Sequence, residues 1–164
     1  VQYVKQINVD EIGIIATTGT IRSGAWENSL KKEIKNIKVI NKACPLLASI
    51  AEEGAARSPK SLEAIHEYMG IFKEHNIDTI ILGCTHYPIY DEIIRNEFSR
   101  PVNLINTGTA IAEKVKKYLK EKQMENTEEK KMSKIVITAE EKDFDLKAKN
   151  ILKSSQTLDI TIFN

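Results

Sequence analysis

The sequence predicts an α/β protein built on a parallel sheet that is covered by helices. Short apolar runs alternate with longer segments in which apolar residues recur at helical spacing. This alternation is typical of βαβ units, in which each helix carries the chain back so that the next strand runs parallel to the last. The clearest runs are residues 12–16, 79–82 and 102–105, and each is followed by glycine or small polar residues.

Composition and charge exclude several classes of function. Hydrophobic residues make up 41% and charged residues 29% of the 164 residues, which is ordinary for a globular protein. The formal net charge of +1 attracts neither nucleic acid nor an anionic membrane, so we expect neither as a partner. No run approaches a membrane span, and from the first residues we expect no secretory leader. The two cysteines are too few for a disulfide framework, and we expect reduced thiols in a cytoplasmic protein.

The first part of the chain predicts two strands and three helices. The strand at 12–16 runs into a polar turn at 17–20, and a helix is expected at 29–37, before a short strand at 38–40. A short helix at 46–53 is expected to be closed by Gly54. In the next helix we expect Ser61 to be the N-cap. Its expected buried stripe is Leu62, Ile65, Met69 and Phe72.

The second part continues the alternation. The strand at 79–82 precedes a helix at 89–98, whose inward residues are expected to be Ile89, Ile93 and Ile94. The strand at 102–105 leads through a polar turn into a helix that carries Ile111, Val115, Tyr118 and Leu119 at helical spacing. Residues 120–134 are dense in lysine and glutamate and predict a helix end and a linker. A strand at 134–138, a helix at 143–153 and an edge strand with Leu158, Ile160 and Ile162 complete the prediction.

Cys84, Thr85 and His86 fall in the loop after the apolar run at 79–82, which predicts a fully buried strand. Gly83 ends that strand, and Pro88 suits the first turn of a helix. Ligands of open α/β sheets bind at the carboxyl ends of strands, and a thiol there lies at the positive end of the next helix, which favours the thiolate. His86 is close enough to orient the thiol or to exchange a proton with it. The opposing interpretation is that a single cysteine is often an inert small apolar residue.

The string GCTHYP at residues 83–88, placed after an apolar strand, resembles an active-site signature of the aspartate/glutamate racemase family. Weaker resemblances cover residues 12–27, 44–54, 103–112 and 136–144. The resemblance implies a two-domain α/β enzyme with its substrate site between pseudo-symmetric halves.

The family's amino-terminal half carries a second cysteine in a Cys-Asn-Thr string, and this sequence contains no such string. We therefore expect the carboxyl-terminal part of the enzyme, with the first domain largely missing. Residues 1–105 would form the second domain, and residues 106–164 would complete the first.

The resemblance also implies the reaction. The expected activity is cofactor-independent conversion of L-glutamate to D-glutamate for peptidoglycan synthesis, with no metal and with a homodimer as the complete enzyme. The α-proton of an amino acid is a very weak acid, so inversion needs a base and an acid on opposite faces of the carbon. Thiolate and thiol suit these two tasks. No lysine lies in a pyridoxal-type string, so the sequence does not suggest a Schiff base.

By resemblance, Cys84 is one of the two bases, and His86 and Glu52 support it. Thr85, His86, Thr17 and Thr20 are the candidate substrate-binding residues. Simpler interpretations stay open: His86 as a helix cap, Thr17 and Thr20 as turn or cap residues, and Glu52 as a solvated carboxylate. Cys44 is expected to be structural, and His66 and His75 are expected to be structural or exposed, while Arg22 could meet a substrate carboxylate.

Three other functions stay open. Cys84 and His86 could serve a hydrolase or amidase, which would also need an oxyanion hole and a third residue to orient the histidine. Aspartate could be the substrate, although the resemblance favours glutamate because His86 stands where members with other substrates tend to carry glutamate. Cys44, Cys84 and His86 could bind a metal, but their spacing does not fit a structural zinc motif. The chain could also be an inactive part of the enzyme.

Overall fold

The computed structural model describes residues 1–126, 134–152 and 159–163. The chain forms two compact units, Val1–Tyr118 and Leu119–Asn164. The boundary between them lies inside helix α7, Thr107–Glu121. The assignment of residues 1–105 and 106–164 to two domains of a larger enzyme stays a prediction.

The first unit is organised around a four-stranded parallel sheet. Its strands are β1, Glu11–Ala16; β2, Lys38–Ala43; β3, Thr79–Leu82; and β4, Asn103–Asn106. They lie in the order β2-β1-β3-β4, and every neighbouring pair is parallel. The predicted α/β fold with a parallel sheet is therefore confirmed. Because all four strands run the same way, the segments that follow them leave from one edge of the sheet.

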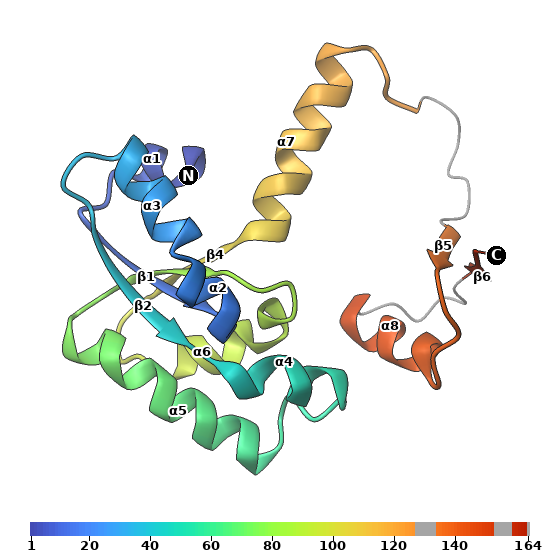
Figure 1. The fold of residues 1–164 in the computed structure, drawn as a ribbon, viewed down its shortest axis with the longest axis horizontal. Helices are drawn as coiled ribbons and strands as arrows, with labels where there is room; N and C mark the ends of the chain where they lie inside the picture. Colours follow the sequence, from blue (N-terminus) through green and yellow to red (C-terminus); the bar gives the residue numbers. More distant parts are fainter. Residues whose placement is uncertain (127–133, 153–158, 164) are drawn as a thin grey trace. The chain divides into compact units, whose positions relative to one another are not determined.

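Helices cover both faces of this sheet. Figure 1 shows α1 and α3 on one side of it and α4, α5 and α6 on the other. The bounds are α1, Gln2–Ile7; α2, Thr18–Ser23; α3, Ala25–Glu33; α4, Pro45–Glu52; α5, Pro59–Glu74; and α6, Asp91–Asn96. One turn of 3-10 helix, η1, spans Tyr87–Tyr90 between β3 and α6.

The core consists of two apolar layers separated by the sheet. Alternate residues of β3 enter opposite layers: Ile80 and Leu82 pack with α4, α5, η1 and α6, whereas Ile81 packs with Val4 of α1 and Leu30 of α3. All four residues of β3 are buried, which explains why a continuous apolar run predicted this strand correctly.

In its described residues, the second unit contains the end of α7, a two-stranded parallel sheet and a further helix. Strands β5, Lys134–Ile137, and β6, Asp159–Ile162, pair directly, and α8, Phe144–Leu152, lies between them in the chain. Strands and a helix were predicted in these places. Part of the predicted linker, Lys153 and Leu158 lie outside the described residues.

Several predicted helix boundaries and faces were wrong. The N-cap of α5 is Ser58, whose side chain accepts a hydrogen bond from the Ser61 backbone N–H. Ser61 is instead buried and donates its hydroxyl proton to the Ala56 carbonyl at 2.7 Å. Leu62 was predicted to be buried but is 46% exposed. The buried face of α5 lies toward Ala64, Ile65, Tyr68, Met69 and Phe72.

The helix predicted at 29–37 lies earlier, because α3 ends at Glu33 and Ile34 is extended. Ile37 reaches the core from the loop before β2. The polar turn predicted at 17–20 is the start of α2. Ile89, predicted to point inward, is 38% exposed because the chain there forms η1 rather than α-helix.

Candidate active site

The candidate site lies at the carboxyl edge of the first unit's sheet. Thr17 follows β1, Cys44 follows β2, Cys84 lies two residues after β3, and Thr107 follows β4. This edge of a parallel sheet is where ligands of open α/β proteins bind. The structure therefore brings the predicted residues from the amino-terminal and central parts of the chain to one edge.

Gly83 allows the Cys84 loop to leave β3 close to β1. Its backbone N–H donates to the Ile15 carbonyl oxygen at 2.8 Å. A Cβ atom at this position would lie 2.9 Å from that oxygen and 3.3 Å from Nε1 of Trp26. No side chain fits there without movement of the strand, so glycine fixes where the loop starts.

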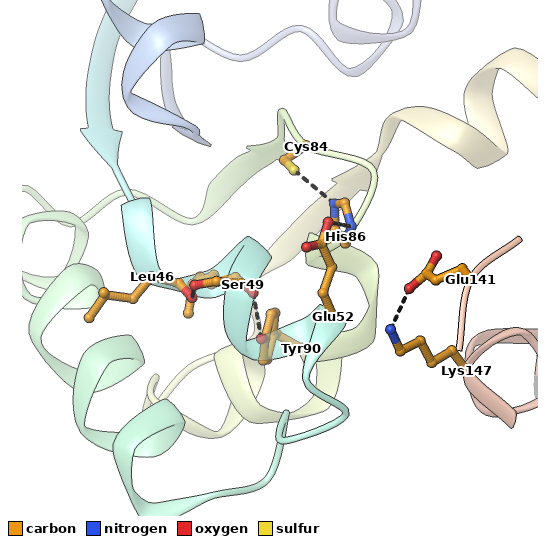
Figure 2. A network of polar contacts seen from close by, with 9 residues as sticks. Leu46, Ser49, Glu52, Cys84, His86, Tyr90, Glu141 and Lys147 are labelled. Atoms are coloured by element: carbon orange, nitrogen blue, oxygen red, sulfur yellow. Dashed lines mark hydrogen bonds and ion pairs between the residues drawn. The ribbon is translucent and has the colours of Figure 1, made fainter. Parts of the chain in front are cut away.

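Three of the predicted residues form a continuous polar chain. Cys84 Sγ lies 3.6 Å from His86 Nδ1, and His86 Nε2 lies 3.2 Å from Glu52 Oε1. Figure 2 shows the three side chains together, with Glu52 reaching from α4 to the loop that carries Cys84 and His86. Cys84 and His86 are half-buried, so the thiol remains accessible to a small molecule.

The order of these contacts assigns the proton on the imidazole. An ionised carboxylate only accepts hydrogen bonds, so Glu52 requires the proton of neutral His86 on Nε2. Nδ1 then presents its lone pair to the Cys84 thiol, which is the arrangement of a base that removes the thiol proton. Transfer of the thiol proton to Nδ1 would place an imidazolium between the Glu52 carboxylate and the thiolate, two negative groups that would stabilise it.

The element that follows Cys84 differs from the sequence prediction. We expected the positive end of a helix beside the thiol, but the chain first forms the four-residue turn η1, and α6 begins only at Asp91. A single turn has too few aligned peptide groups for a full helix dipole. His86 is therefore the main partner of the Cys84 thiol in this structure.

The predicted substrate-binding threonines have different surroundings. Thr85 is exposed in the loop between Cys84 and His86. Thr17 caps α2: its hydroxyl oxygen accepts the Thr20 backbone N–H at 3.3 Å and lies 3.0 Å from the Thr20 hydroxyl oxygen. This is the cap role weighed as the simpler interpretation, and it leaves both side chains at the sheet edge, partly exposed.

The other cysteine and the other histidines lie outside the polar chain. Cys44 is fully buried, and burial raises the pKa of its thiol to about 12. His66 contacts Glu97 at 2.8 Å, and His75 is the C-cap residue that follows α5. In the described part of the chain, no group of three or more cysteine, histidine or acidic residues could hold a metal ion.

Two residues at this site were missed by the sequence analysis. Tyr87 and Tyr90 are fully buried, and their hydroxyls donate to the Cys44 carbonyl at 2.8 Å and the Leu47 carbonyl at 2.7 Å. The sequence signal that could have identified them is that the two tyrosines lie three residues apart, directly after the Cys84 loop. In a 3-10 turn this spacing places both side chains on one face.

One pocket of about 190 Å³ opens at a different place in the same unit, where β4 runs into α7. Its lining includes Tyr3, Asn106, Thr109 and Glu113 but none of the predicted catalytic residues.

Among the described residues, no helix combines the length and apolar character that crossing a bilayer requires.

Comparisons with known proteins identify the family to which the chain is similar. A family model for Asp/Glu/Hydantoin racemases matches residues 1–115. The chain is 36% identical over 135 residues to a glutamate racemase of Bacillus cereus, which covers 82% of this chain and 50% of that protein. It is also 36% identical over 149 residues to a glutamate racemase of Sulfurihydrogenibium sp., covering 91% of this chain and 55% of that protein.

Among solved structures, the chain is similar to glutamate racemase of Francisella tularensis in complex with D-glutamate. The TM-score is 0.87 at 28% sequence identity, and the match covers 99% of this chain and 60% of that one. The chain thus spans about half the length of the curated relatives it matches.

Proposed function

The chain belongs to the Asp/Glu/Hydantoin racemase family, and we propose that it supplies one of the two thiol bases for cofactor-independent racemisation of glutamate. The observation that carries this proposal is the polar chain Glu52–His86–Cys84 at the carboxyl edge of the sheet. It gives a half-buried thiol a base on one side and gives that base a carboxylate on the other.

The proposed step begins with the Cys84 thiolate, whose proton His86 has taken. The thiolate removes the α-proton of L-glutamate, so that the C–H bond breaks and an S–H bond forms. The electron pair of the C–H bond moves onto the α-carbon and its carboxylate. A second acid on the opposite face then protonates the carbon and gives D-glutamate. In the reverse direction, the Cys84 thiol delivers its proton to the carbanion and L-glutamate forms.

Three threonines are proposed to hold the substrate. Thr85 lies between the two proposed catalytic residues and offers a hydroxyl and a backbone N–H, while Thr17 and Thr20 offer hydroxyls at the end of the neighbouring strand β1. Such groups suit the carboxylates of glutamate. The role in peptidoglycan synthesis, the cytoplasmic location and a homodimer of the complete enzyme are proposed from the family resemblance.

A Cys/His amidase is the second candidate, because Glu52 supplies the third, orienting residue that such an enzyme needs. Family membership favours the racemase. A panel of amide substrates distinguishes the two, since an amidase releases ammonia or an amine and a racemase releases neither.

The proposal is tested by circular dichroism of L-glutamate and, separately, D-glutamate. The chain is produced together with the segment of the Bacillus cereus relative that lies outside the matched region. We expect the signal of either enantiomer to decay to zero, and we expect no decay with Cys84→Ala. Aspartate in place of glutamate tests the substrate. Undiminished decay with Cys84→Ala contradicts the assignment of Cys84 as a base.

A further inference from the structure

We propose that Tyr87 and Tyr90 are positioning residues that hold α4, and with it Glu52, at the correct distance from the loop carrying Cys84 and His86. Tyr87 directly follows His86, and Glu52 is the last residue of α4. The proposal rests on the proposed function, since it concerns the polar chain that makes Cys84 a base.

The two tyrosines form a matched pair of bonds between the turn and the helix. Their hydroxyls donate to the carbonyl oxygens of Cys44 and Leu47, at 2.8 and 2.7 Å, at the beginning of α4. Donors three residues apart thus meet acceptors three residues apart. Two such bonds fix both the separation of η1 from α4 and the direction in which the helix leaves the sheet.

The contact between Glu52 and His86 is too weak to fix the position of α4 relative to η1 by itself. The Glu52 side chain is 65% exposed and that of His86 is 31% exposed. Exposed ion pairs are weak, because water competes for both partners and long side chains must be held still. Glu52 therefore reaches His86 for much of the time only if the backbone of α4 already lies in the right place.

The tyrosines meet the requirements of a permanent tether. Both rings are fully buried, so water does not compete for their hydroxyl protons. Burial raises the pKa of Tyr90 to about 12 and raises that of Tyr87 further above its ordinary value. Both hydroxyls consequently remain protonated donors at neutral pH.

The test measures the rate at which iodoacetamide alkylates Cys84 in the chain of residues 1–164, followed by peptide mass spectrometry. Phenylalanine keeps the buried ring and removes only the hydroxyl. We expect Tyr87→Phe and Tyr90→Phe each to slow the alkylation of Cys84 by about threefold, because a less constrained Glu52 supports His86 less well. The matched control is Tyr3→Phe, at a 41% exposed tyrosine of α1, and it leaves the rate unchanged.

A second pair of variants separates positioning from general loosening. Glu52→Gln slows the alkylation of Cys84, and adding Tyr87→Phe or Tyr90→Phe to it slows the reaction no further. The proposal is overturned if Tyr87→Phe or Tyr90→Phe slows the alkylation of Cys84 as much in the Glu52→Gln variant as in the unaltered chain. Faster alkylation of fully buried Cys44 in both tyrosine variants also overturns it, because the hydroxyls then merely hold the fold together. If only one of the two tyrosine variants exposes Cys44, the alkylation rate of Cys84 in the other variant decides whether the positioning role holds.

The same measurement distinguishes failure of the proposal from failure of the proposed function. If His86→Gln and Glu52→Gln leave the Cys84 rate unchanged, the polar chain does not activate the thiol, and both fail. If those two variants slow the reaction and the tyrosine variants match the unaltered chain, only the positioning role fails.

Discussion

At the scale of single residues, two glycines show how the surroundings decide what a residue does. Gly83 lies where a Cβ atom would press on the Ile15 carbonyl oxygen, whereas a Cβ atom at Gly70, inside α5, would meet nothing within 4 Å beyond its chain neighbours and the backbone of its own helix. The sequence alone does not separate them, because the close approach at Gly83 comes from a strand far away in the chain.

We expect Gly83→Ala to lower the free energy of unfolding by about 1–3 kcal/mol, since β1 or the loop must shift to make room. The matched variant Gly70→Ala raises the free energy of unfolding by about 0.5–1 kcal/mol, because alanine favours helix. Urea denaturation followed by circular dichroism measures both. Equal effects of the two variants would show that the close contact at Gly83 is easily relieved.

The two cysteines are a second case at this scale. Each follows a strand, and the sequence analysis separated them only by the string around Cys84. The structure gives the physical reason: Cys44 is buried with a strongly raised thiol pKa, while Cys84 is half-buried and faces His86. His86 could be paired with Cys84 from their spacing, but the pairing of Glu52 with His86 depends on how α4 packs against η1.

At the scale of elements, one carboxylate ties α5 to the end of α6. Glu97 contacts Lys73 at 2.9 Å and His66 at 2.8 Å. Burial pushes the pKa of Glu97 upward, but hydrogen bonds from Lys73 and His66 outweigh it and leave the pKa below its ordinary value. A carboxyl group whose pKa is lower in the folded than in the unfolded state stabilises the fold at pH values above its ordinary, unfolded-state pKa. This stabilisation is lost as the pH falls through the lowered pKa of the folded state.

We therefore expect Glu97→Gln to lower the free energy of unfolding by about 1 kcal/mol at neutral pH. The difference from the unaltered chain should shrink below about pH 4, where glutamate becomes protonated. Thermal or urea unfolding across this pH range measures it. The matched control is Glu63→Gln, at an exposed position of α5, and it should have little effect at any pH. A loss for Glu97→Gln that stays constant with pH would exclude the ion pairs as its source.

Elements were predictable to different degrees for a physical reason. Strands β1 and β3 at the centre of the sheet are buried on both faces, so a short apolar run marks each of them, whereas β2 at the sheet edge has no buried residue and gives a weaker signal. Helix faces depend on partners, and Leu62 was assigned to the core because its spacing fits while the real face is rotated toward Tyr68. The N-cap Ser58 could have been found, since Pro59 directly after it is a known start signal.

At the scale of the whole molecule, α7 has an unusual surface. None of its residues is buried, and Ile111, Val115 and Tyr118 form an apolar stripe, with exposures of 63%, 49% and 54%. Apolar stripes of this kind tend to be covered by protein. We expect the chain of residues 1–164 to self-associate through this stripe at micromolar concentrations.

Sedimentation velocity tests this expectation. Ile111→Lys and Val115→Lys should each weaken association by about tenfold or more, since burial of one such side chain contributes about 1.5–3 kcal/mol. The matched control Leu62→Lys changes an exposed apolar residue of α5 and should leave association unchanged. A chain that stays monomeric at all accessible concentrations contradicts the expectation.

The number of usable thiols limits what the chain does alone. Of its two cysteines, Cys44 is fully buried with a raised thiol pKa, so Cys84 is the one thiol placed to exchange a proton with a substrate. A single base reaches one face of the α-carbon, and inversion needs two. We therefore expect residues 1–164 alone to leave the circular dichroism of L- and D-glutamate unchanged over hours.

Two variants test the same point when the chain is produced together with the segment of the Bacillus cereus relative that lies outside the matched region. Cys44→Ala, which removes the other thiol, should not alter racemisation by this pair, whereas Cys84→Ala should abolish it. Inversion by residues 1–164 alone would mean that one thiol, or a group other than a thiol, serves both faces.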